Sequence, residues 1–242
     1  MSNRGKSPDL HLEHLLSRRT KEALIEICRS LNIKGISNLR KSKLVSLLVR
    51  RIPEIVEEKM QLWDQPVYDL VKQICTSSPI HYLEPEEELL PEDYLLGECI
   101  AFHGEDSRGE YVVIPQEIKQ LFLSLDSAAY QEKIRRNTQI LRLSKGLLHF
   151  YGCLSFDALT EAIHHFLPEP VESFVVCPIL WETGLYNWDI TSERGYFCDG
   201  RLTDLDYLLS ELKMRTSLEY KRLAYSEVWQ AGDPHYFHDQ AR

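Results

Sequence analysis

The residue types best suited to acid–base or metal chemistry gather in two short segments of this 242-residue chain. One is the adjacent pair His164 and His165, and the other is the C-terminal sequence Asp-Pro-His-Tyr-Phe-His-Asp at 233–239. Imidazole nitrogens beside a carboxylate can exchange protons near neutral pH or bind a metal ion. A mobile polar chain terminus has the same composition without any such role, and we favour this interpretation for His235 and His238.

Zinc binding is the second chemistry to weigh. Structural zinc sites take Cys and His ligands in closely spaced pairs, and this chain has no Cys-x-x-Cys pair. The conceivable ligands are Cys198, His164, His165, His235 and His238, whose spacings match no common zinc motif. We therefore predict no bound metal, and six reduced thiols in a cytoplasmic protein. The cysteines are Cys28, Cys75, Cys99, Cys153, Cys177 and Cys198.

The sequence motifs that mark common enzyme classes are missing. It contains no Gly-x-x-x-x-Gly-Lys-Ser/Thr phosphate loop, no Gly-x-Ser-x-Gly elbow and no His-Glu-x-x-His. We predict that the protein is not an enzyme and uses no cofactor, with a hydrolase or nuclease using an unrecognised site as a third alternative. No apolar run approaches the ~20 residues that span a bilayer, and the N-terminal residues lack a signal-peptide core, so no membrane partner is expected.

Charge is divided unevenly along the chain. Residues 1–52 contain twelve Lys or Arg and four Asp or Glu, a charge of +8, so the remaining residues carry −17 of the total of −9. This asymmetry predicts a small basic module that meets a polyanion, joined to an acidic body that does not.

The basic segment also has the pattern of two helices. Thr20 is placed to cap a helix through Leu31 with one apolar stripe, a turn follows at 32–38 around Gly35, and a second helix runs until Pro53 interrupts it. The stripe of the first helix is Ala23, Leu24, Ile27, Cys28 and Leu31, and that of the second is Leu44, Val45, Leu48 and Ile52.

Residues 20–44, TKEALIEICRSLNIKGISNLRKSKL, resemble the helical N-terminal module of transcription termination factor Rho and the related SAP-type domains. The matching positions are the first apolar stripe, Gly35, and Leu39-Arg-Lys-x-x-Leu44 at the entry to the second helix. The resemblance covers about residues 18–52 and implies contact with DNA or RNA. The residues that would make this contact are Lys34, Arg40, Lys41 and Lys43, with Arg18, Arg19 and Lys21 as further candidates. An RNA-binding barrel follows this module in Rho, but residues 53–120 show no run of five strands, so termination activity is not implied.

Beyond Pro53 the patterns alternate between helices and short hairpins. Helices are predicted at 55–62, 66–75, 115–123, 130–151, 155–166, 171–180 and 203–214, the last capped by Thr203. Strands are predicted at 98–102, 111–114, 186–191 and 195–199, with a turn at 104–109. The acidic stretch 84–93, bracketed by Pro85 and Pro91, is predicted to be a linker or loop.

Helices followed by a hairpin occur twice, which predicts two winged-helix-like units. The expected fold class is therefore α+β and mostly helical, with a basic module at 1–53, winged-helix-like units at 54–126 and 127–214, and a tail at 215–242. In the second unit Gly152 ends one helix and Ser155 caps the next. This next helix contains Asp157 and Glu161 and no Lys or Arg, so we do not expect it to enter a DNA groove.

These patterns predict a nucleic-acid-binding regulatory or accessory protein that binds DNA or RNA weakly and in a salt-dependent way. Its acidic body would serve contacts with a protein partner. The alternative is a protein–protein interaction adaptor whose basic module docks onto an acidic protein.

Overall fold

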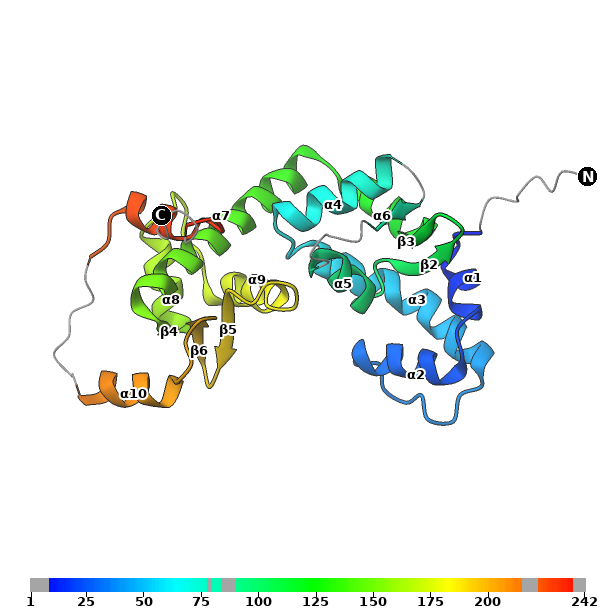
Figure 1. Ribbon diagram of the computed structural model, residues 1–242, viewed down its shortest axis with the longest axis horizontal. Coiled ribbons are helices and arrows are strands. Elements are labelled where there is room, and N and C mark those ends of the chain that lie inside the picture. The colour runs from blue at the N-terminus through cyan, green and yellow to red at the C-terminus, as the bar shows by residue number, and fades with distance from the viewer. Residues whose placement is uncertain (1–8, 78–79, 84–89, 215–221, 237–242) are drawn as a thin grey trace, which may run out of the picture. The chain divides into compact units, whose positions relative to one another are not determined.

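The computed structural model describes residues 9–77, 80–83, 90–214 and 222–236 (Figure 1). The chain divides into two compact units, Met1–Gln61 with Gln65–Lys133, and Leu62–Asp64 with Ile134–Arg242. Helices predominate in both units, and each unit holds one small three-stranded antiparallel sheet. The predicted α+β, mostly helical class is confirmed. The predicted segments 1–53 and 54–126 fall within one unit, apart from Leu62–Asp64.

The first unit is built around the long helix α3 (Lys41–Met60), which contacts α1 (Leu12–Ser17), α2 (Lys21–Ser30) and α6 (Gln116–Leu125). Its other helices are α4 (Gln65–Thr76), α5 (Leu90–Gly97) and the first turns of α7 (Ala128–Tyr151). Strands β1 (His81–Tyr82), β2 (Phe102–Asp106) and β3 (Gly109–Val113) form an antiparallel sheet in the order β1-β3-β2.

The predicted helix pair of the basic segment is confirmed at its first helix and turn. The Thr20 side chain accepts a hydrogen bond from the Ala23 N–H at 3.1 Å and so caps α2. Leu24, Cys28 and Leu31 are buried. Gly35 has φ +78°, a left-handed conformation that glycine adopts without steric cost.

The predicted break at Pro53 is wrong, because α3 continues through Pro53 to Met60. Proline removes one helical hydrogen bond, which normally ends or kinks a helix. Here Ile52, Val56 and Met60 extend the apolar stripe of α3 and are fully buried. Their packing outweighs the local cost of proline, so the predicted separate helix at 55–62 is the second half of α3.

In the hairpin of the first unit, the first strand lies later than predicted and the second, Gly109–Val113, begins two residues before the predicted 111–114. Strand β2 begins at Phe102, and the turn is limited to Ser107 and Arg108, where the Asp106 side chain accepts the Arg108 N–H at 2.8 Å. The predicted strand at 98–102 is therefore wrong except for Phe102. Residues 84–89 of the predicted acidic loop lie outside the described residues, whereas residues 90–93 begin α5.

The second unit has the order helix, strand, helix, helix, hairpin. After α7 come β4 (Cys153–Ser155), α8 (Phe156–His164), α9 (Ser173–Thr183), β5 (Ile190–Glu193) and β6 (Tyr196–Asp199). The sheet order is β4-β6-β5. Helices α10 (Leu205–Met214) and α11 (Tyr225–Ala231) follow. Figure 1 shows α8 and α9 beside this sheet.

The cap and turn signals at the start of the second unit are confirmed, but the predicted strand at 186–191 is wrong except for residues 190 and 191, with which β5 begins. Gly152 has φ +75° just after α7, and the Ser155 side chain accepts the Ala158 N–H at 3.2 Å at the start of α8. Strand β4 between them was not predicted, because three residues are too few to show a strand period. The cap of α10 is Asp204, whose carboxylate accepts the Tyr207 N–H at 2.8 Å, and Thr203 is not the cap.

The predicted C-terminal tail is wrong for residues 222–236, which pack against the second unit. Val228 and Ala231 of α11 are buried. Two glycines permit this packing, because a Cβ atom on Gly146 would overlap the Val228 carbonyl and one on Gly232 would overlap the Arg142 carbonyl. Within the described part of the chain, no helix is long and apolar enough to cross a membrane.

Candidate nucleic-acid interface

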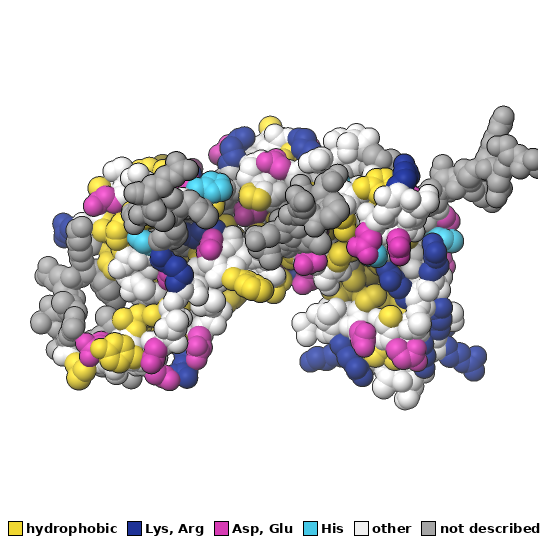
Figure 2. Space-filling model, in the orientation of Figure 1, with side chains coloured by type: hydrophobic (Ala, Val, Ile, Leu, Met, Phe, Trp, Pro, Cys, Tyr) yellow, Lys and Arg dark blue, Asp and Glu magenta, His cyan; other side chains and the backbone are white. Residues whose placement is uncertain are grey.

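The residues predicted to contact nucleic acid lie on helices and turns of the first unit. Lys34 lies in the turn after α2, Arg40 is the N-cap residue of α3, and Lys41 and Lys43 lie in the first turn of α3. All four side chains are exposed. Figure 2 shows Lys and Arg side chains gathered around α2 and the start of α3, with acidic side chains among them. We call Lys34, Arg40, Lys41 and Lys43 the basic face.

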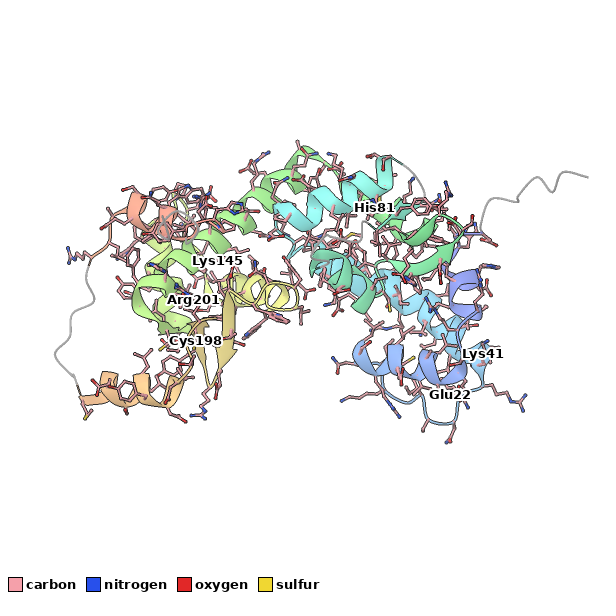
Figure 3. All side chains as sticks on the ribbon, in the orientation of Figure 1. Glu22, Lys41, His81, Lys145, Cys198 and Arg201 are labelled. Carbon is pink, nitrogen blue, oxygen red and sulfur yellow. The ribbon has the colours of Figure 1, made fainter. Side chains whose placement is uncertain are left out.

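The cations of the basic face have no carboxylate partner in the part of the chain that the structure describes. Among the residues that the structure describes, none forms an ion pair or side-chain hydrogen bond with Lys34, Arg40, Lys41 or Lys43. Figure 3 places Lys41 at the end of the helix pair that also carries Glu22. The Glu22 carboxylate is exposed and opposes anion binding at this end.

The electrostatics of the α3 N-terminus are unfavourable to the helix itself. The first N–H groups of a helix lack intrahelical partners and carry about half a positive charge, so acidic residues stabilise this position. The first turn of α3 has no acidic residue, and its N-cap Arg40 makes no capping hydrogen bond. Cationic side chains here add repulsion that an anion would relieve, since helix N-termini bind phosphate groups readily.

The remaining candidates lie at the two preceding helices. Lys21 opens α2 and is half-buried, whereas Arg18 and Arg19 follow α1. Arg18 and Arg19 line a pocket of about 300 Å³ between α1 and the β2–β3 hairpin. The Arg19 guanidinium donates to the His103 carbonyl at 3.5 Å and lies 6.0 Å from the centre of the Phe102 ring. Arg19 is therefore held against the hairpin, and Arg18 remains exposed.

A second cluster of charged side chains lies in the second unit and was not predicted. Lys145 binds Asp189 at 2.7 Å, and Arg201 binds both carboxylate oxygens of Asp199 at 2.7 and 2.5 Å. Arg201 also donates to Nδ1 of His149 at 2.9 Å, because a guanidinium can only donate. These side chains line a pocket of about 220 Å³, and Figure 3 shows Lys145 and Arg201 within the second unit.

A third ion pair, between Arg142 and Asp233, joins the C-terminal segment to this cluster. Arg142 binds Asp233 at 2.7 Å, donates to the Trp229 carbonyl at 2.9 Å and stacks 4.3 Å from the Trp229 ring centre. Each cation in the cluster thus faces an aspartate 2 to 91 positions away in the sequence. The arrangement joins α7, the hairpin and the C-terminal segment, and its paired charges leave little attraction for an added anion.

The acid–base and metal candidates of the sequence are not brought together in the described part of the chain. His164, His165 and His235 are exposed, Cys198 is buried, and His238 and Asp239 lie outside the described residues. No group of three His, Cys, Asp or Glu side chains suited to a metal ion occurs among the described residues.

The six cysteines are free and buried, in keeping with the predicted thiols. Burial raises the pKa of Cys99 to about 12 and the pKa values of Cys75 and Cys198 to about 11. Because the thiolate is the nucleophilic form, these residues are poorly suited to covalent catalysis.

Comparison with protein-family models, with curated proteins and with solved structures finds no match to this chain.

Proposed function

We propose that this protein is a nucleic-acid-binding accessory or regulatory protein that contacts DNA or RNA through the basic face. The observation that carries the proposal is the set of exposed cations at the uncapped N-terminus of α3, which form no ion pair with any residue that the structure describes. A phosphate there would meet both the side-chain charges and the helix N-terminus. With about four to six phosphate contacts, binding should be weak, with a log–log salt slope of about −3 to −5.

Residues 18–52 are, in this proposal, a module of the Rho N-terminal and SAP-like kind, and the second unit is winged-helix-like. The order α7, β4, α8, α9, β5, β6 supports the latter. The helix before the hairpin, α9, would be the groove-reading helix of such a unit. It contains no Lys, Arg or His, so in this proposal the second unit serves protein contacts and nucleic-acid binding is left to the first.

The test measures binding of the full-length protein to fluorescent single-stranded RNA and duplex DNA by anisotropy at several salt concentrations. Replacing Arg40, Lys41 and Lys43 together by Ala should weaken binding and flatten the salt slope by about 2 to 3, since each phosphate contact contributes about 0.9 to it. All three side chains are exposed and repel the positive end of the helix, so the variant should unfold at the same temperature as the parent or slightly above it.

A matched pair of charge variants separates a local contact from a net-charge effect. Glu22→Gln removes the opposing carboxylate near Lys41, and Glu58→Gln removes an exposed carboxylate near the other end of α3. The first should tighten binding more than the second. Equal affinities for the triple-alanine variant and its parent at low salt would overturn the proposal.

The adaptor alternative is favoured by one observation, the large apolar side chains that the second unit exposes. Phe174 and Trp188 are 78% and 75% exposed. Exposed apolar surface of this kind marks contacts with other proteins. An adaptor would bind neither nucleic acid at low salt, so the same titration distinguishes the two functions.

A further inference from the structure

Helix α9 is apolar on both sides, and the described residues of the second unit leave one of those sides exposed. Its inner side packs into the core of the second unit through Val176, Ile179 and Leu180, all of which are buried. Its outer side carries Phe174, Pro178 and Trp181, and Leu185 continues the stripe in the turn that follows. Phe174, Trp181 and Leu185 are 78%, 48% and 53% exposed. We call these four residues the α9 stripe.

The spacing of the α9 stripe is that of a helix–helix contact. Steps of four, three and four residues keep side chains on one face, as in the seam of a helical pair. A helix that is apolar all round is ordinarily buried all round. The stripe is also supported from below, since Trp181 packs edge-on against Phe156 at 5.5 Å and lies 6.2 Å from Phe197.

Charge restricts what can cover the stripe. Helix α9 has no Lys, Arg or His, and its single acidic residue, Glu182, is buried. Exposed carboxylates lie at its N-terminal end, at Glu172 and at Asp157, which binds Ser173 at 3.1 Å. A nucleic acid would be repelled at that end and would find no cation along the stripe.

We propose that the α9 stripe is the interface for a second copy of this chain. In an isologous contact the same patch of each copy faces its counterpart, so a charge on the patch can come close to an identical charge on the partner. Such a contact therefore requires a patch without charges that would repel one another. Antiparallel pairing of two α9 helices places the acidic N-terminal end of each against the uncharged Leu185 end of the other. Apolar side chains then meet along the whole stripe.

The size of the stripe sets the strength of the contact. Large aromatic side chains bury roughly 150–250 Å² each, so complete coverage of Phe174, Trp181 and their neighbours removes some hundreds of Å² per copy. Stable interfaces bury about 1,200–2,000 Å² in total. Because much of Trp181 and Leu185 is already covered, two stripes bury less than this range even when fully covered, and the contact is therefore a weak, transient one.

Dimerisation through the α9 stripe does not depend on nucleic-acid binding by the basic face, although each would strengthen the other. A dimer carries two basic faces, and linked sites bind a polyanion more tightly than either alone. If the protein does not dimerise, the anisotropy test of nucleic-acid binding by the basic face is unaffected. If the basic face does not bind nucleic acid, the test of dimerisation is likewise unaffected.

The test is sedimentation equilibrium of the full-length protein from low to high micromolar concentration. The parent should change from monomer to dimer, and Phe174→Glu with Leu185→Glu should raise the dissociation constant by at least about tenfold, because charges would be buried unpaired. Tyr207→Glu is the matched control, since it places the same charge on a 64% exposed aromatic residue of α10 and should dimerise like the parent.

A crosslinking experiment keeps the result independent of the folding of these variants. Pro178→Cys places a thiol near the middle of the stripe, and mild oxidation should yield a disulfide-linked band of twice the chain mass. The six native cysteines are buried. A parent protein that remains monomeric at every concentration, with no crosslinked Pro178→Cys dimer, would show that the stripe is not an interface between copies.

Discussion

The fold controls the protonation of His149, a half-buried residue of α7. Burial, and then the positive charge of Arg201, lower the pKa of His149 below its usual range, although the Asp199 charge acts in the opposite direction. The ring is neutral in the folded protein and accepts a hydrogen bond from Arg201 at Nδ1. Protonation would remove that hydrogen bond and place two cations side by side.

The sign of the pH effect follows from this lowered pKa. The unfolded chain binds a proton at His149 first as the pH falls through about 6.5, so folding free energy is lost below that pH. We expect the parent to lose more stability between about pH 7.5 and about pH 5.5 than His149→Gln, which cannot titrate. Urea unfolding at both pH values measures this difference, with His164→Gln as an exposed-histidine control. Parallel losses in the parent and His149→Gln would contradict the assignment.

At the scale of an element, helix α3 contains a proline whose unfavourable effect on the helix is outweighed by the packing of its buried side chains. Its buried side chains recur from Leu44 to Met60 on both sides of Pro53. Proline within a helix costs about 3 kcal/mol relative to alanine, but part of this is offset because proline also restricts the unfolded chain.

Pro53→Ala should therefore stabilise the protein by about 1–3 kcal/mol, by restoring a backbone N–H to the helix. The measurement is the shift in denaturant midpoint. Glu57→Ala, an exposed change one turn later on α3, should change stability by less than about 0.5 kcal/mol. Destabilisation by Pro53→Ala would mean that α3 depends on a bend at this residue.

At the scale of the whole molecule, the C-terminal segment completes the second unit. Gly146 and Gly232 allow the backbones of α7 and α11 to approach, and the Arg142–Asp233 ion pair joins the same two segments. Core positions tolerate added volume poorly, because their neighbours have little room to move.

We expect Gly146→Ala to displace α11 and to cost about 1–3 kcal/mol, although alanine favours a helix more than glycine does. Limited proteolysis followed by mass spectrometry should then show faster cleavage within 222–236. Gly97→Ala adds the same methyl group at the end of α5, where it would meet no described atom within 4 Å outside its chain neighbours and its own helix backbone, and should cleave like the parent. Unchanged cleavage in Gly146→Ala would show that α11 does not depend on this close approach.

The sequence by itself determined those features that depend on residues near one another in the chain. The Thr20 and Ser155 caps, the Gly35 and Gly152 turns and the apolar stripe of α2 are local, so composition and spacing were sufficient to predict them. The exposure of the four cations of the basic face also followed from the positions that the apolar stripe leaves outside.

Only the tertiary structure decided the features that depend on distant partners. The continuation of α3 through Pro53, the docking of α11 on α7 and the Arg201–His149 contact join residues through packing or ion pairs that no local pattern encodes. The exposed side of α9 belongs here too, because an apolar run predicts burial and only the fold shows which of its faces the core covers. The free energies of burial and of ion pairing arise from contacts between segments. They are therefore determined only when those segments pack together in the folded chain.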